Sequence, residues 1–354
     1  MPPTTFSAKG LRLLTRVVSA IVAFYLLLWM INFQDEAPSA ESLRLAKILA
    51  TRSEVPEAQN GFIYYAKYLE STQTEQSSLS NAQPRPDASV LTSLTQCQSE
   101  QCLAALQTAG AELNALLSQQ QKALASYQII LEYPFWQYPV LDAQTRVVPF
   151  GPLLHMQQLF LLSVWQKVQA DQLATAKVML EQDLTFWRQQ LQQSDHRLSK
   201  SIAHSAIQRH WLYASFFKQS MTQHHFQQLS PAQCQQPLRD DELSMLSVFA
   251  GEWRFSNSAI DLLLQQKSHS AFVDWFRLGW WRPFLQHQAL SNMFAVQYLA
   301  CAEPRTSYRE LHFPWYSWLY NPVGKVFVQL EGELCGVQSM ELPALETTRQ
   351  QLLR

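Results

Sequence analysis

The sequence predicts an all-α fold in which an N-terminal transmembrane helix precedes an irregular, multi-helix periplasmic domain. Three observations support this prediction. The 354 residues include only 9 glycines, whereas tight hairpins and phosphate-binding loops need glycine at special positions. Leu, Ala and Gln are abundant and runs of Val or Ile are few, which favours helices over strands. Hydrophobic residues make up 47% of the chain, enough for a large core.

The first 33 residues are basic, whereas the rest of the chain is weakly acidic. They contain Lys9, Arg12 and Arg16 and no acidic residue, so the remainder has 27 − 3 = 24 basic residues against 28 acidic ones, a net charge of −4. A nucleic-acid-binding protein usually presents a basic face. A weakly acidic body without a Lys/Arg run therefore predicts no nucleic-acid partner.

The stretch LRLLTRVVSAIVAFYLLLWMINF (Leu11–Phe33) predicts a membrane anchor. As a helix it would extend about 34 Å, enough for the hydrocarbon core of a bilayer of about 30 Å. The three cations precede its uncharged part, Val17–Ile31, and two acids follow it. The positive-inside rule then predicts that residues 1–10 are a cytoplasmic tail. We expect residues 11–33 to be a signal anchor crossing the inner membrane once, with the bilayer as its partner and the C-terminal domain in the periplasm.

Two alternatives to a retained anchor remain. A cleaved signal peptide needs small residues at positions −1 and −3 of the cut. Only Ala37-Pro38-Ser39 provides them, eight residues beyond Ile31. The other alternative is a buried core helix, which the basic flank and the terminal position disfavour.

The remainder divides into membrane-proximal helices with a flexible loop (34–89) and an α-helical periplasmic domain (90–354). In the first part we expect short helices over 39–49 and 60–70, because Phe62, Tyr65, Ala66 and Leu69 share one helical face. The polar stretch 71–89 predicts the loop. The helices expected in the second part are 102–132 with a break near Gly110, 153–169, 172–192, 194–218, 240–249, 257–267, 283–301, and 339 or 341 to 354. Between them, 133–152 predicts a packed connector and 219–240 a loop, while 323–330 fits helix or strand. We find no fixed repeat period.

Five cysteines would lie in an oxidising compartment if the anchor prediction holds. Cys97 and Cys102 in CQSEQC are five positions apart, and a bend at a helix start would bring them within bonding reach. Cys301 and Cys335 are the second candidate pair, which would leave Cys234 unpaired. The alternative is five separate buried thiols.

Signatures of catalysis or metal binding are missing from the sequence. There is no GxSxG, P-loop, GxGxxG or HExxH pattern, and CxxxxC has the wrong spacing for zinc. The nine histidines show no shared metal-binding spacing. We therefore predict no cofactor, metal or catalytic residue. Three aromatic clusters (135–138, 275–281 and 313–320) are interpreted mainly as packing, with sugar stacking or contact with the bilayer as alternatives.

Three segments, CQSEQCLAAL, DLTFWRQQLQQSDHRLSKSIAHSAI and NPVGKVF, resemble a family of uncharacterised bacterial membrane-anchored proteins. The resemblance covers about Cys97 to Lys325 and rests on packing motifs. His196 and His204 depart from apolar positions of the family pattern. The resemblance implies an α-helical, envelope-facing domain and no known activity.

Within the second segment, Asp183, Arg188, Asp195 and Lys200 are candidates for a structural ion pair. Arg188 and Asp195 are seven positions apart on one helical face. Asp195 could pair with Lys200, and either residue could pair with a neighbouring helix. A buried Asp–Arg pair is more often structural than catalytic.

These observations favour a membrane-anchored periplasmic helical protein with a binding or scaffolding role in the cell envelope. An envelope protein is the candidate partner. The alternative is a cell-envelope hydrolase whose acids meet in an aromatic-lined cleft.

Overall fold

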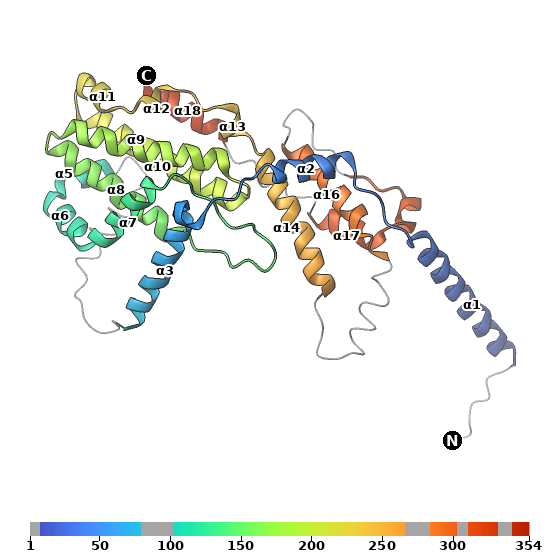
Figure 1. The fold of residues 1–354 in the computed structure, drawn as a ribbon. Helices are drawn as coiled ribbons and strands as arrows, with labels where there is room; N and C mark the ends of the chain where they lie inside the picture. Colours follow the sequence, from blue (N-terminus) through green and yellow to red (C-terminus); the bar gives the residue numbers. More distant parts are fainter. Residues whose placement is uncertain (1–7, 79–101, 266–283, 303–310, 332–341, 354) are drawn as a thin grey trace. The chain divides into compact units, whose positions relative to one another are not determined.

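All regular secondary structure is helical in the residues that the structure, a computed structural model, describes: 8–78, 102–265, 284–302, 311–331 and 342–353 (Figure 1). These residues contain no β-strand, only an isolated bridge between Asn60 and Phe135. The all-α prediction is confirmed. The chain forms two compact units, unit 1 (1–51 and 249–338) and unit 2 (52–248 and 339–354). The division expected at residues 33 and 89 separates an anchor from periplasmic parts, and the two compact units do not test it. The chain returns to unit 1 after completing most of unit 2.

Helix α1 (Ala8–Ile31) contains the single segment, among the described residues, that is long and apolar enough to cross a membrane. This segment, Gly10–Ile31, has a mean hydropathy of 2.0 and is 0% buried over its most apolar window. The chain therefore does not use this stretch as a core helix. The helix ends two residues before the predicted end of the anchor, since Asn32 is buried in unit 1 and leaves the helical path.

Unit 1 also contains α2 (Ala40–Ala50), the part of α14 (Leu246–Gln265) from Phe249 onward, α16 (His287–Ala302), the 3₁₀ helix η3 (Trp315–Leu319) and α17 (Pro322–Glu331). Asn292 of α16 joins α2, because its Oδ1 accepts hydrogen bonds from Ser39 N and Ser42 Oγ, both at 2.9 Å. Ser256 lies inside α14 and bonds to Tyr298 at 2.8 Å, so the prediction that it caps a new helix was wrong. The ambiguous 323–330 stretch is helical.

Unit 2 is built on a continuous hydrophobic core. Its helices are α3 (Gly61–Ser78), α5 (Cys102–Thr108), α6 (Gly110–Gln119), α7 (Gln121–Glu132), α8 (Gly151–Gln169), α9 (Leu173–Gln193), α10 (Arg197–Ser220), α11 (Gln223–Leu229), α12 (Ala232–Gln235), α13 (Asp240–Leu243) and α18 (Leu342–Leu353), besides the 3₁₀ turn η1 (Glu57–Gln59). Helix α9 packs between α8 and α10. The predicted tight turn between α8 and α9 is confirmed, with Asp171 in the left-handed region at φ 57°.

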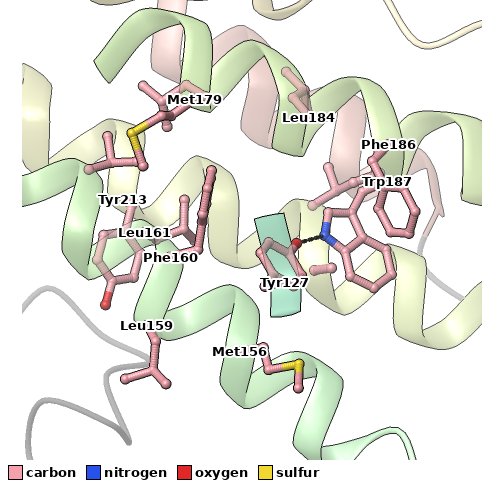
Figure 2. Packing of buried hydrophobic residues seen from close by; sticks show 14 of the residues in the cluster. Tyr127, Met156, Leu159, Phe160, Leu161, Met179, Leu184, Phe186, Trp187 and Tyr213 are labelled. Atoms are coloured by element: carbon pink, nitrogen blue, oxygen red, sulfur yellow. Dashed lines mark hydrogen bonds between the residues drawn. The ribbon is translucent and has the colours of Figure 1, made fainter. Parts of the chain in front are cut away.

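Large side chains from four helices meet at the centre of unit 2. Figure 2 shows Tyr127, Phe160 and Trp187 around this centre, where the Trp187 Nε1 donates a 2.8 Å hydrogen bond to the Tyr127 hydroxyl. All three residues are at most 2% exposed. The core thus contains polar atoms that must be satisfied internally, and these lead to the candidate site.

Three local predictions for unit 2 differ from the structure. Residues 71–78 continue α3, and 79–89 lie outside the described residues. The cap of α10 is His196, whose ring accepts from Ser199 N, because Ser194 instead ends α9. The expected loop 219–240 contains two short helices, since Thr222 caps α11 and Pro231 begins α12.

Candidate functional site: a buried polar centre and the pocket beside it

The four charged residues selected from the sequence all lie in unit 2. Asp183 and Arg188 lie on α9, Asp195 lies in the α9–α10 turn and Lys200 lies on α10. Their main partners come from elsewhere in the chain, so the four do not form one ion-pair cluster. Most of these partners lie more than 25 positions away, so no spacing pattern in the sequence reveals them. The sequence therefore identified the charged residues but not the groups that they contact.

Asp183 is the centre of a polar network that joins four helices. The carboxylate is 0% exposed and accepts hydrogen bonds from the Tyr127 hydroxyl at 2.5 Å and from Gln157 Nε2 at 3.2 Å. It also faces His210 Nδ1 at 2.8 Å. A buried carboxylate would be costly without such partners. The network therefore fixes α7, α8 and α10 against α9.

His210 connects this network to α12. Burial alone would lower the pKa of His210, but the hydrogen bond and charge of Asp183, together with the thiol of Cys234, raise it to about 9. His210 Nε2 has no well-aligned hydrogen-bond partner among the described residues, so Cys234 acts through proximity. At neutral pH the ring is therefore a cation in a buried ion pair.

The order Cys234, His210, Asp183 has the composition of a thiol, base and carboxylate array used for nucleophilic catalysis. Its burial argues against that use here. The three residues are 1%, 0% and 0% exposed, so a substrate has no approach to the thiol. The array is better explained as a structural link that holds α12 on the helical core.

Arg188 forms a second, separate polar centre with α13. Its Nε and Nη2 donate to the two oxygens of the Glu242 carboxylate, both at 2.7 Å. The remaining donors bond to the carbonyl oxygens of Gln233 (2.8 Å), Gln236 (3.1 Å) and Pro237 (2.9 Å). Since a guanidinium has five N–H donors, Arg188 is fully satisfied. This residue closes the segment 233–242 onto α9.

The other two sequence candidates also hold segments together. The Lys200 Nζ donates to the carbonyl oxygens of Leu191 at 2.5 Å and of Glu242 at 2.7 Å. Burial lowers the pKa of Lys200 to about 8, against the opposing charges of Glu242 and Asp241. Asp195 forms an ion pair with Arg52, which also donates to the Tyr138 carbonyl. These contacts are structural in kind.

A pocket of about 730 Å³ opens on the other side of α10, against α18. One face of α10 supplies its floor through positions spaced three and four apart, Ser205, Gln208, Leu212, Ser215 and Gln219. Arg209, Trp211 and Lys218 flank this face, and α18 contributes Thr348, Gln351 and Leu352. Along α10 the floor extends about 21 Å. This volume falls within the range of small-molecule pockets, about 300–1,000 Å³.

The flanking side chains of the pocket are donors only. Arg209 donates from Nη1 to the Leu154 carbonyl at 2.7 Å, and its Nε and Nη2 have no hydrogen-bond partner among the described residues. Trp211 is 2% exposed, and its Nε1 has no hydrogen-bond partner among those residues. The Lys218 Nζ donates to the Leu352 carbonyl at 2.8 Å. Because the lining contains no carboxylate, the pocket suits a ligand with anionic oxygen acceptors.

Residues of α10 and α18 connect the pocket to the buried polar centre. Arg209 also lies 3.4 Å from Gln157 Oε1, and Gln157 contacts Asp183. On the opposite wall, Arg349 of α18 donates to the carbonyl oxygens of Cys234 at 2.9 Å and Gln235 at 3.2 Å. The buried centre therefore positions both walls of the pocket. No pattern in the sequence indicates this pocket, because α18 lies more than 120 positions after α10.

Cys234 is a free, buried thiol. Cys102 begins α5 and Cys301 lies near the end of α16, whereas Cys97 and Cys335 lie outside the described residues. The two disulfide pairings therefore stay predictions. No group of three or more His, Cys, Asp or Glu that could hold a metal ion occurs within the described residues.

Two of the aromatic clusters can be followed. Trp136 and Tyr138 are buried and pack on Phe62, as the packing interpretation predicts. In the third cluster Trp315 and Tyr316 are 82% and 61% exposed, so packing does not account for them. The cluster at 275–281 lies outside the described residues.

Comparisons of this chain with family models, curated proteins and solved structures found no match. The resemblance to a family of membrane-anchored proteins therefore stays a prediction.

Proposed function

We propose that this protein is a single-pass inner-membrane protein whose helical units lie in the periplasm and bind an anionic ligand there, either free or displayed by an envelope protein. The pocket between α10 and α18 supports the binding role most directly. It combines small-molecule size with the cationic donors Arg209 and Lys218 and a lining without a carboxylate.

The exposed apolar helix α1 supports the anchoring part of the proposal. Its three preceding cations favour a cytoplasmic N-terminus. A C-terminal alkaline phosphatase fusion is expected to be active and a C-terminal cytoplasmic fluorescent reporter silent. The opposite pattern would contradict the periplasmic location. A mature chain lacking residues 1–39 would show instead that the segment is a cleaved signal.

The binding role is tested with the full-length chain in nanodiscs of neutral lipid. Calorimetric titration with D-glucuronate and D-glucose 6-phosphate compares a carboxylate with a phosphate, and D-glucose is the uncharged control. We expect binding of at least one anion and none of glucose. Arg209→Gln should weaken that binding by roughly tenfold or more, because a hydrogen bond to a charged group contributes about 1.5–3 kcal/mol.

Lys177→Gln is the matched control for Arg209→Gln. Lys177 lies on α9 in the same unit, is not part of the pocket lining, and loses the same unit of charge on substitution. Equal loss of affinity in the two variants would point to long-range charge instead of the pocket. Failure of both anions to bind would contradict the proposed ligand class.

The hydrolase alternative gains no support from this site. Its sequence rationale required two acids in an aromatic-lined cleft, but the pocket lining has no carboxylate and one aromatic residue. We therefore do not carry this alternative further.

A further inference from the structure

The end of α1 is clamped to the folded part of unit 1. Asn32, which follows the helix, is 3% exposed. Its side-chain amide donates to the Leu319 carbonyl at 2.8 Å and accepts from the Asn321 N–H at 2.7 Å. Gln286 donates to the Asn32 carbonyl, and Gln286 N donates to Asn321 Oδ1 at 2.9 Å. The η3–α17 junction is therefore held at a fixed place beside the last turn of α1.

A further contact lies deeper along α1. The ring of Phe284 meets the ring of Tyr25 edge-on, with centroids 5.3 Å apart. Tyr25 precedes Asn32 by seven positions, which is about 10 Å along a helix. Part of unit 1 thus reaches back alongside the apolar helix instead of stopping at its end.

The uncharged part of α1 is too short for a bilayer. Val17–Ile31 spans 15 residues without a charge, about 22 Å, whereas the hydrocarbon core is about 30 Å thick. If Arg12 and Arg16 reach the headgroups of one leaflet, the opposite boundary lies several ångströms beyond Ile31. Asn32 and the η3–α17 junction that it contacts, called the clamp below, lie at that depth.

The surface beside the clamp is aromatic and exposed. Trp315 and Tyr316 of η3 are 82% and 61% exposed, and Phe33 is 73% exposed. Phe33 continues an aromatic path from Trp29, whose ring lies 5.3 Å away. Trp and Tyr are enriched at the boundary between hydrocarbon and headgroups, where an amphipathic ring is favoured.

Charged groups near the clamp are held by protein contacts. Asp35 accepts from the N–H groups of Gln288 and Ala289 at 2.7 and 3.0 Å, and so caps α16. Lys325 Nζ donates to the carbonyl oxygens of Ser317, at 2.6 Å, and Tyr320. These contacts keep an ammonium and a carboxylate from facing lipid without partners.

We infer that Trp315, Tyr316 and Phe33 insert into the interfacial layer of the outer leaflet of the bilayer that α1 crosses. Unit 1 is then seated on the membrane at a second contact and is not suspended from a free tether. The aromatic groups extend the membrane contact beyond Val17–Ile31, the uncharged part of α1. This inference rests on the proposed anchoring by α1.

The test places the photoreactive amino acid p-benzoylphenylalanine in the full-length chain, reconstituted in bilayers of phosphatidylethanolamine and phosphatidylglycerol. Three positions are compared: Phe24 within α1, Trp315 in η3, and Val178, an exposed apolar position on α9 of unit 2. After irradiation, lipid adducts are measured by mass spectrometry. We expect a yield at position 315 comparable with that at 24 and well above that at 178.

The three positions test the anchoring by α1 and the membrane contact of unit 1 separately. Adducts at 24 with only the Val178 background at 315 would overturn the seated arrangement and leave the anchor intact. No adducts at 24 would overturn the anchor and the inference together. Equal yields at 315 and 178 would also overturn the inference, because labelling would then not report a specific contact.

A second measurement avoids the bulky probe. In protein labelled with 5-fluorotryptophan, Trp315→Phe identifies the Trp315 resonance and Trp211→Phe identifies the buried Trp211 resonance as reference. Spin-labelled lipid should broaden the first and not the second. A Trp315 signal as sharp as that of Trp211 would contradict membrane insertion.

Discussion

At the scale of single residues, the most informative group is His210. Its imidazolium faces the Asp183 carboxylate at 2.8 Å with both groups fully buried. The folded-state pKa of about 9 exceeds the ordinary value of 6.5, so folding favours the protonated ring. The stability from this pair is full below pH 6.5 and is lost as the pH rises through about 9.

The first prediction is a pH dependence that His210 causes. The contribution of His210 to the free energy of unfolding should fall between pH 6.5 and 9 by an amount on the order of 3 kcal/mol, since each pKa unit corresponds to about 1.4 kcal/mol. Lys200, whose pKa burial lowers to about 8, acts in the opposite direction above pH 8, so the His210 contribution is read from the difference between the parent and His210→Gln. Urea unfolding of His210→Gln should lose most of this slope. His225→Gln, at an exposed position on α11, is the control and should keep it. An unchanged slope in His210→Gln would show that other groups cause it.

The second prediction concerns the unpaired N–H of Trp211. Trp211→Phe keeps an aromatic ring and removes a buried donor that costs about 1–3 kcal/mol. Without ligand the variant should therefore be as stable as the parent or more stable, although some of the gain is lost to the smaller ring. Thermal unfolding without ligand measures the difference. A variant clearly less stable than the parent would contradict the cost given to the buried N–H.

At the scale of elements, short helices in unit 2 are held by buried cations. Helices α12 and α13 have four residues each, too few to be stable alone. Arg188 on α9 holds both helices in place, because it donates hydrogen bonds to the Gln233 carbonyl in α12 and to the Glu242 carboxylate in α13. Helix α18 is attached in a similar way by Arg349, which pairs with Glu346 at 2.5 Å and lowers the pKa of that carboxyl to about 2.

The third prediction is that Arg188→Ala destabilises unit 2 by roughly 3–5 kcal/mol, because it leaves the Glu242 carboxylate buried without its partner. The matched control is Arg239→Ala. The Arg239 side chain is 58% exposed. It pairs with Asp241 at 3.3 Å and lies 3.6 Å from Glu242, and because water screens these contacts its removal should cost at most about 1 kcal/mol. Chemical denaturation measures both. Similar costs for the two variants would contradict the structural role given to Arg188.

The fourth prediction links α18 to binding. Arg349→Ala removes the contacts to the carbonyl oxygens of Cys234 and Gln235, and α18 should exchange its amide hydrogens faster. Anion affinity should fall although Arg349 does not line the pocket. Thr347→Ala, at an exposed position of the same helix, should change neither quantity. Normal exchange and affinity in Arg349→Ala would separate α18 from the site.

At the scale of the whole molecule, compartment and covalent chemistry are linked. A periplasmic location permits disulfides, whereas a cytosolic one keeps thiols reduced. Cys234 is free and 1% exposed, so it should be protected from reagents in the folded protein. The remaining four cysteines are the predicted pairs Cys97–Cys102 and Cys301–Cys335.

The fifth prediction is therefore a thiol count. Protein isolated from membranes under acid quench should show one alkylated cysteine after denaturation without reductant, namely Cys234, and five after reduction. Native protein should show none. Peptide mapping assigns the pairs. Five alkylated cysteines before reduction would contradict both the disulfides and the oxidising compartment.

The sequence alone determined the helical class, the apolar N-terminal helix and most helix positions in unit 2, because these depend on local propensity and on hydrophobic periodicity. It also selected Asp183, Arg188, Asp195 and Lys200 as charges with a structural role. Only the tertiary structure decided their partners, the pocket between α10 and α18, the buried His210 centre and the clamp on Asn32. Most of these contacts join residues separated by more than 20 and up to almost 300 positions, and no periodicity along the chain encodes which distant side chains meet when the core closes.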